Sequence, residues 1–281
     1  MQPLCDALRH RGARVEVPDW DDRCVDWAHF DMVVLRSTWD YPRRHQAFLA
    51  WIASVERVTT LVNDGDVVRW NTDKRYLLDL ARADVPVVAT WRIEPGGDVE
   101  AALDELLLSH PRHEFVVKPS IGSGAAYARR YLPGERTQAV TDHVRLILDA
   151  GFPVLLQPYF RSVDTHGETT VIYFDGRYSH AIGKGRMLIA GAPLLASHPP
   201  PSIRRREASA REKAVAEAAI RVAPGSGRLL YARVDLVGDE GGQPHVLELE
   251  LTEPTLFLRH DADAATRFAG CMLAHHATTR E

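Results

Sequence analysis

The pattern of apolar and polar residues along the chain predicts an alternation of helices and strands. Helical periodicity places helices at residues 1–12, 45–55, 98–108, 138–150, 207–222 and 261–275. Alternating or continuous apolar runs predict strands at residues 13–18, 31–38, 60–62, 86–91, 114–118, 154–157, 169–174 and 177–182. Such an alternation is typical of an open α/β sheet, in which ligands bind beyond the carboxyl ends of the strands.

The most informative stretch is a predicted β-hairpin from Tyr231 to Pro254. Folding its Gly-rich turn symmetrically places Asp235 directly across from Glu248, with Glu250 on the same face as Glu248. The opposite face carries three leucines, Leu247, Leu249 and Leu251. Like charges in this arrangement cost up to about 1 kcal/mol, which a bound Mg²⁺ ion would offset. An ordinary hairpin with its polar face in water has the same pattern, so both interpretations stay open here.

Composition limits the class of protein. The chain has 281 residues, of which 45% are hydrophobic, enough to bury a substantial core. A net charge of −4 argues against nucleic acid as a partner, and the basic run at 204–206 is expected to be a solvated helix entry. Neither a run of 18 apolar residues nor a signal-peptide pattern occurs, which predicts a soluble, cytoplasmic protein without a membrane partner. Three widely spaced cysteines indicate neither a disulfide framework nor a zinc site.

Three segments are expected as domains, at residues 1–85, 86–158 and 159–281. The first begins with a helix, so we expect a Rossmann-like α/β domain that lacks its first strand. Its last helix has Asn71 or Thr72 as the expected N-cap, which places Lys74 in the first turn, where the helix dipole favours a bound anion over a cation. The proline-rich stretch 185–205 is expected to be irregular, as a lid or a disordered segment.

Two loops carry candidate binding residues. Lys118 ends a strand and is followed by small residues from Ser120 to Ala126, so an ammonium and backbone N–H groups are available to wrap phosphate oxygens. The same residues are also typical of an ordinary Gly-Ser hairpin turn, so both interpretations stay open. The loop at 36–41 follows a strand and combines polar with aromatic side chains, which indicates either a substrate loop or a capped turn.

The order of these signals resembles that of the ATP-grasp superfamily of carboxylate–amine ligases. In chain order they are Lys74, Lys118 with its glycine loop, Gln157-Pro158-Tyr159, Glu168, Arg233-Val234-Asp235 and Glu248-Leu249-Glu250. The resemblance covers about residues 60–260. It implies an α/β fold, α+β in the ATP-binding part, with an N-terminal pre-ATP-grasp domain, a lid subdomain over 86–158 and a metal-binding subdomain after it. Glu250 departs from the family pattern, where asparagine is common.

Within that superfamily, three stretches are similar to the O-ureido-serine cyclo-ligase group of cycloserine biosynthesis. They are LRSTWDY, NDGDVVRWNTDKRYLLDLA and LELELTEPTLFL. The resemblance implies an ATP- and Mg²⁺-dependent enzyme that activates the carboxylate of a small amino acid-like substrate as an acyl phosphate. A nitrogen of the same molecule would then attack it and close a ring. The alternatives are a ligase that joins two separate molecules and a nucleotide-binding module without catalysis; a homo-oligomer is compatible with each.

The same resemblance implies a role for each motif residue. The ATP phosphates would be contacted by Lys74, Lys118, Ser120, Gly122, Ser123, Gly124 and Ala125. The adenine would be bordered by Gln157, Pro158 and Tyr159, and the ribose would be held by Glu168. Two Mg²⁺ ions would be bound by Asp235, Glu248 and Glu250, with Arg233 and Lys184 as the catalytic residues beside the transferred phosphoryl group. The substrate would be bound by Arg36, Ser37, Thr38 and Tyr41.

Overall fold

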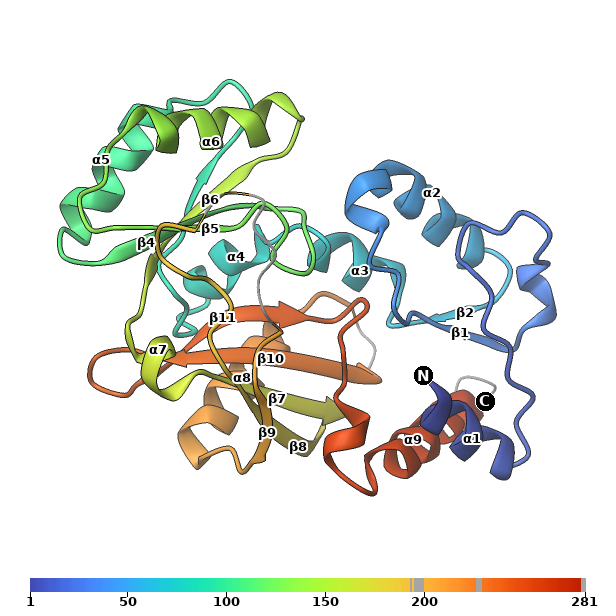
Figure 1. The fold of residues 1–281 in the computed structure, drawn as a ribbon. Coiled ribbons are helices and arrows are strands. Elements are labelled where there is room, and N and C mark those ends of the chain that lie inside the picture. The colour runs from blue at the N-terminus through green and yellow to red at the C-terminus, as the bar shows by residue number, and fades with distance from the viewer. Residues whose placement is uncertain (193, 195–199, 226–228, 279–281) are drawn as a thin grey trace.

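The computed structural model describes residues 1–192, 194, 200–225 and 229–278. Within these residues the strands form three sheets, each with its own helices (Figure 1). The strand orders are β1-β2, β3-β6-β4-β5 and β11-β10-β7-β8-β9. None of the described helices is long and apolar enough to cross a membrane.

The N-terminal part contains a parallel two-stranded sheet flanked by helices. Its elements are α1 (Gln2–His10), η1 (Trp27–His29), β1 (Met32–Val34), η2 (Tyr41–Arg44), α2 (His45–Val55), β2 (Thr60–Val62), α3 (Gly65–Asn71) and α4 (Tyr76–Arg82). The strand predicted at 31–38 is shortened to β1. The strand predicted at 13–18 is wrong: none of the described strands pairs with these residues, so their backbone lacks a hydrogen-bond ladder.

The expected N-cap at Asn71 or Thr72 is also wrong. Asn71 is the last residue of α3, which was not predicted, and Thr72 follows as its C-cap. The Asn71 amide is used elsewhere, because its Nδ2 donates to the Leu249 carbonyl and its Oδ1 accepts from the Leu251 N–H. Tertiary bonds to a distant strand thus override the local capping preference. Lys74 consequently lies between α3 and α4 rather than in a first helical turn.

The middle part is an antiparallel four-stranded sheet covered by two helices (Figure 1). Its elements are β3 (Trp91–Ile93), α5 (Val99–Ser109), β4 (Glu114–Pro119), β5 (Arg129–Tyr131), α6 (Gln138–Asp149) and β6 (Val154–Tyr159). The strand predicted at 86–91 lies instead at 91–93, and β5 was not predicted. β6 continues through Pro158, which pairs with Phe115 of β4. On its other side, β6 is paired with β3 only as far as Leu156. Pro158 therefore lies where the β3 side of the strand is an open edge, a position at which a strand tolerates proline.

The C-terminal part is an antiparallel five-stranded sheet with α8 against one face. Its elements are α7 (Ser162–His166), β7 (Glu168–Phe174), β8 (Arg177–Lys184), β9 (Ile203–Arg206), α8 (Ala210–Val222), β10 (Tyr231–Gly238), β11 (Pro244–Glu250), η3 (Leu258–His260) and α9 (Ala264–Thr278). The basic run at 204–206 is therefore a strand paired with β8 and not a helix entry. Within the stretch 185–205, β9 begins at Ile203; residues 193 and 195–199 lie outside the described residues.

The hairpin of β10 and β11 confirms the predicted cross-strand pair, Asp235 opposite Glu248. A bulge follows at once, because Leu236 pairs with Val246 and leaves Leu247 as the extra residue. The prediction that Leu247 shares the buried face of Leu249 is therefore wrong. Leu249 packs in the core under the sheet, whereas Leu247 packs in a separate cluster with residues such as Val88.

Candidate active site

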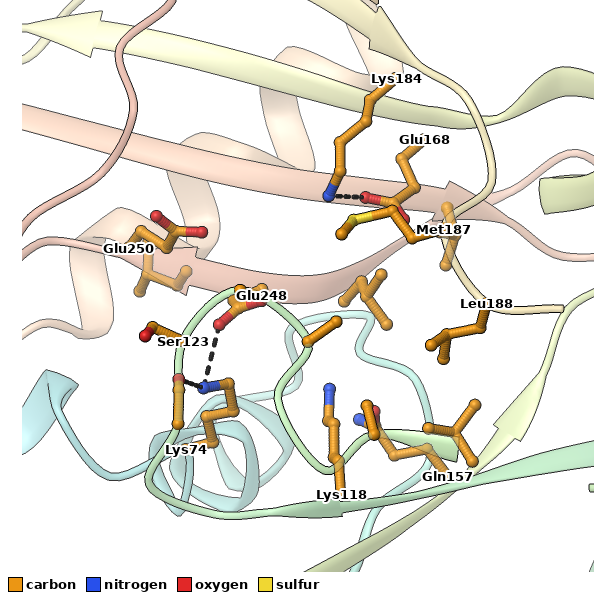
Figure 2. A pocket seen from close by; sticks show the side chains of 18 of the residues that line it. Lys74, Lys118, Ser123, Gln157, Glu168, Lys184, Met187, Leu188, Glu248 and Glu250 are labelled. Atoms are coloured by element: carbon orange, nitrogen blue, oxygen red, sulfur yellow. Dashed lines mark hydrogen bonds and ion pairs between the residues drawn. The ribbon is translucent and has the colours of Figure 1, made fainter. Parts of the chain in front are cut away.

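A cavity of about 450 Å³ lies between the four-stranded and the five-stranded sheets. Predicted site residues that line it are Tyr41, Lys74, Lys118, Gly122, Ser123, Gly124, Ala125, Gln157, Pro158, Tyr159, Glu168, Lys184, Arg233, Glu248 and Glu250. Figure 2 shows charged side chains reaching into it from both sides. Asp235 lies behind this wall, bound to Arg233, and Ser120 is fully buried beneath the glycine loop. The cavity therefore collects residues that are far apart in the sequence.

The acidic residues of the hairpin form one compact group. Asp235, Glu248 and Glu250 each offer a carboxylate oxygen within 4.8 Å of the others, and no other group of three metal-binding side chains of this kind occurs in the described residues. Arg233 holds the group together: its Nη2 and Nε bind the Asp235 oxygens at 2.5 and 2.9 Å, and its Nη1 lies 3.2 Å from Glu250. Thr170 donates a further hydrogen bond of 2.8 Å to Asp235.

Burial and neighbouring charges set the protonation of these carboxylates in opposite directions. Burial alone would raise the pKa of Asp235, but Arg233, Lys184 and the Thr170 hydrogen bond together outweigh it and lower that pKa below its usual value. The pKa of Glu248 is likewise lowered, because the Lys74 and Lys118 ammonium groups together outweigh the effect of its burial. For Glu250 burial prevails over Arg233 and raises the pKa to about 8. Two of the three carboxylates are thus ionised at neutral pH, and the third is readily ionised by an added positive charge.

Lys74 links three parts of the site. Its Nζ lies 3.1 Å from Glu248 Oε1 and donates a 2.6 Å hydrogen bond to the Gly122 carbonyl (Figure 2). Its backbone N–H donates to the Ser120 carbonyl at 2.9 Å. Lys74 therefore fixes the glycine loop relative to β11, although it belongs to the linker between α3 and α4.

The other two lysines have contrasting surroundings. Lys118 reaches from β4 into the cavity (Figure 2), and burial lowers its pKa to about 8. Lys184, the last residue of β8, binds Glu168 Oε2 at 2.8 Å and lies 3.8 Å from Asp235 Oδ2. Burial lowers the pKa of Lys184, but the Glu168 and Asp235 carboxylates together outweigh that effect and raise the pKa above its usual value. Lys184 therefore carries a permanent charge, whereas the charge of Lys118 depends on pH.

The glycine loop is held at Ser120 and at Ser123, in addition to the bond from Lys74 to Gly122. Ser120 donates its N–H to the Pro153 carbonyl and its hydroxyl to Asp73. Ser123 donates to the Trp39 carbonyl at 2.9 Å. Gly124 has a positive φ of 62°, a conformation that glycine adopts without strain. The loop's backbone thus lines the cavity from a fixed position.

The far end of the cavity is apolar. Tyr159 and Pro158 lie there with Met187 and Leu188 from the segment after β8. The Gln157 amide donates to Thr90 Oγ1 at 2.9 Å, and Tyr159 donates its hydroxyl to Asp164 at 3.0 Å. Both side chains are therefore anchored, and a flat apolar group could insert between the walls.

The predicted substrate loop divides between two cavities. Tyr41 lines the main cavity and stacks on Phe48, and burial raises its pKa well above the usual value. Arg36 and Thr38 line a second cavity of about 440 Å³, and Ser37 is exposed. Arg36 Nε and Nη1 and the Thr38 hydroxyl are buried without a hydrogen-bond partner in the described residues. The structure thus brings only Tyr41 of the four predicted residues to the main cavity wall.

Two residues at the site were not selected from the sequence. Glu253 lines the cavity, and Asp73 accepts hydrogen bonds from Ser120 and Arg92. Trp39, which belongs to the predicted loop at 36–41, also lines the cavity. Glu253 lies three residues after the last residue of the acidic strand β11, which is a signal that the sequence carries. The role of Asp73 depends on contacts with distant residues, for which no local signal exists.

Comparison with known proteins agrees with this geometry. The family model for the N-terminal domain of D-cycloserine synthetase DcsG matches residues 1–63. The cycloserine biosynthesis protein DcsG of Streptomyces lavendulae is 43% identical over 276 residues, 96% of this chain and 91% of the relative. The crystal structure of D-cycloserine synthetase DcsG superposes with a TM-score of 0.91 at 41% identity, covering 98% of this chain and 94% of that one.

A more distant solved structure shares the fold. The ATP complex of D-alanine–D-alanine ligase from Bacillus anthracis has a TM-score of 0.69 at 15% identity, over 99% of this chain and 91% of that chain. The fold is thus that of the ATP-grasp ligases. At 43% identity over almost its whole length, the chain belongs to the family of the cycloserine biosynthesis protein DcsG.

Proposed function

We propose that the protein is an ATP- and Mg²⁺-dependent ligase that closes the ring of O-ureido-serine to form cycloserine. The observation that carries this proposal is the meeting of Asp235, Glu248 and Glu250 with Lys74, Lys118 and Lys184 around one cavity. Membership of the family of a cycloserine biosynthesis protein supports the substrate. An amino acid derivative is also small enough to share the cavity with a nucleotide's terminal phosphate.

The cavity suits a nucleotide along its whole length. The apolar end at Pro158, Tyr159 and Leu188 fits an adenine ring, and Glu168 lies where a ribose hydroxyl would follow. Next come Lys118, Lys74 and the loop from Ser120 to Ala125, whose cationic and N–H groups fit phosphate oxygens. We assign these residues to ATP in that order.

The acidic group suits Mg²⁺. Its ligand set consists of carboxylates alone, the ligands that this hard cation prefers, and their mutual repulsion is relieved by a divalent ion. We propose two ions at Asp235, Glu248 and Glu250. When bound, they neutralise charge on the phosphate oxygens during transfer.

Residues of the chain then have distinct tasks in the reaction. The substrate carboxylate oxygen attacks the γ-phosphorus, ADP leaves, and an acyl phosphate forms. Lys74 and Lys118 hold the phosphates, whereas Arg233 and Lys184 stabilise the negative charge that develops during transfer. A ureido nitrogen of the same molecule attacks the acyl carbon, phosphate leaves and the nitrogen loses its proton. Water then attacks the carbamoyl carbon, the bond to the ring nitrogen breaks, that nitrogen regains a proton, and the released carbamate decomposes to CO₂ and ammonia. Ring closure gains from the proximity of both reacting groups in one molecule.

Two further expectations stay proposals. The division into domains at residues 85 and 158 is supported by the distribution of the strands, since each segment contributes its own sheet. A homo-oligomer is compatible with the fold, and light scattering on the purified protein would measure it.

Phosphate release from ATP tests the function. We expect release with O-ureido-serine as the sole substrate and Mg²⁺ present, and none with pairs of ordinary amino acids. Release that requires two separate substrates would favour an intermolecular ligase instead. The Glu240→Gln variant, changed at an exposed turn residue, is the matched control for the site variants described below.

A further inference from the structure

Glu253 is a buried carboxylate that lies beside the acidic group. It has no role in the proposed binding of ATP and Mg²⁺ or in phosphoryl transfer. It is 8% exposed and lines the main cavity together with Arg233, Glu250 and Tyr41. Its backbone is fixed, because its carbonyl accepts a hydrogen bond of 3.4 Å from Trp39 Nε1. The carboxylate is thus held at a defined place on the wall where the substrate would react.

In the part of the chain that the structure describes, no side-chain cation is bound to the carboxylate. No lysine or arginine nitrogen of the described residues lies within 4.0 Å of it. Burial raises its pKa to about 7, against the nearby Lys74 and Arg36 charges, which favour the ionised form. Lys74 is committed to Glu248 and Gly122, and Arg36 lies over the Tyr231 ring. Buried carboxylates are normally paired, so this one is suited to a cation that arrives with a ligand.

A metal ion is a poor candidate for that cation. The carboxylates that converge within 4.8 Å are those of Asp235, Glu248 and Glu250, and Glu253 is not a member of that group. The cation must instead belong to a molecule whose reacting carboxylate faces Arg233. In an α-amino acid, the ammonium is attached to the carbon next to that carboxylate, so both groups reach adjacent places on the same wall.

We propose that Glu253 binds the α-ammonium group of the amino acid substrate and thereby selects α-amino acids over their des-amino analogues. This inference rests on the proposed function, since it names the group that positions that substrate. Glu253 orients the molecule so that its carboxylate faces the phosphate site. The residue determines specificity and takes no part in transferring the phosphoryl group.

A comparison of two substrates tests this role. O-ureido-serine and 3-(ureidooxy)propanoate differ only in the ammonium group. We expect the wild type to prefer the former by about 10²-fold or more in kcat/KM. In Glu253→Gln this preference should fall below tenfold, through a rise in KM for O-ureido-serine, while KM for ATP stays unchanged. The Glu240→Gln control should keep the full preference.

The outcomes separate this inference from the proposed function. If the wild type does not turn over O-ureido-serine, the proposed function fails. If it does, and Glu253→Gln keeps the wild-type preference for the ammonium-bearing substrate, the role of Glu253 is overturned. Should Glu253→Gln fail to fold, Glu253→Asp retains the charge but shortens the side chain. That variant should show an intermediate preference, and an unchanged preference would likewise overturn the inference.

Discussion

Asp235 and Glu248 face each other across β10 and β11, and the bulge of the hairpin begins at the very next residue. Before the bulge, the same register pairs Arg233 with Glu250. The arginine and all three carboxylates therefore lie next to one another on the hairpin. A one-residue shift before this pair would turn Glu248 to the other face. The bulge therefore changes only the environment of Leu247 and leaves the acidic group intact.

Replacing Asp235 by asparagine should nearly abolish turnover. The amide keeps the shape and still accepts the Thr170 hydrogen bond, but it removes the charge that Arg233 and a metal ion require. We expect kcat to fall by about 10²-fold or more. ADP formation measures the effect, and circular dichroism checks the fold. Wild-type-like activity in a folded Asp235→Asn protein would rule out the metal assignment.

Magnesium should stabilise the protein against heat. The ion binds the folded acidic group and relieves its repulsion, so at a concentration of 100 times Kd the gain is about 2.7 kcal/mol. Thermal unfolding with and without Mg²⁺, after treatment with a chelator, measures this gain. The Tm increase should disappear in Asp235→Asn and persist in Glu240→Gln. An equal increase in both variants would place the ion elsewhere.

Replacing Lys74 by methionine should weaken ATP binding more than catalysis. The variant loses the bond to the Gly122 carbonyl and leaves Glu248 without its ion pair. Hydrogen bonds to charged groups contribute about 1.5–3 kcal/mol, which corresponds to a rise of about 10- to 100-fold in KM for ATP. Lys213→Met, in which the lost ammonium lies over the Tyr178 ring, is the control. An unchanged KM in Lys74→Met would remove Lys74 from the nucleotide site.

The efficiency of ATP use should fall above pH 8. Burial lowers the pKa of Lys118 to about 8 in the free protein, so this lysine loses its charge as the pH rises through that value. A neutral amine binds phosphate less well, and kcat/KM for ATP should decrease by up to about tenfold per pH unit. Lys118→Arg keeps its charge and should remove the decrease. If the decline is the same in both proteins, another group causes it.

Stability should decrease between pH 6.5 and 4 through His143. Burial lowers the pKa of this histidine to about 4, and its ring nitrogens contact the Tyr131 hydroxyl at 2.9 Å and the Tyr127 carbonyl at 3.0 Å. The unfolded chain therefore binds a proton in this range that the folded chain does not, and stability is lost as the pH falls. Urea unfolding should show a smaller pH slope for His143→Gln. Parallel slopes would contradict this origin.

Local patterns were sufficient for the hairpin but not for residues whose partners are distant. The pairing of Asp235 with Glu248 follows from turn symmetry alone, and the structure has the same pair. Asn71, by contrast, has the composition of an N-cap but binds β11, which lies almost 180 residues further along the chain. Residues 13–18 have the sequence alternation of a strand, but none of the strands that the structure describes pairs with them.

The candidate site likewise contains residues that the sequence could identify and residues whose position depends on distant parts of the chain. The motif residues from Lys74 to Glu250 could be selected because their order along the chain resembles that of the ATP-grasp ligases, and most of them line one cavity. Arg36 and Thr38 could not be placed, since a loop's direction depends on the elements around it. Glu253 was missed because its lack of a bound cation becomes visible only when Lys74 and Arg36 are seen in space.

The most direct measurement is the stoichiometry of the reaction with O-ureido-serine, ATP and Mg²⁺ and no second substrate. Mass spectrometry identifies the ring product, and an ADP assay counts the nucleotide consumed. We expect one cycloserine for each ADP, with neither formed by Asp235→Asn. ADP formation without a ring product, or only after a separate amine is added, would contradict the proposed ring closure.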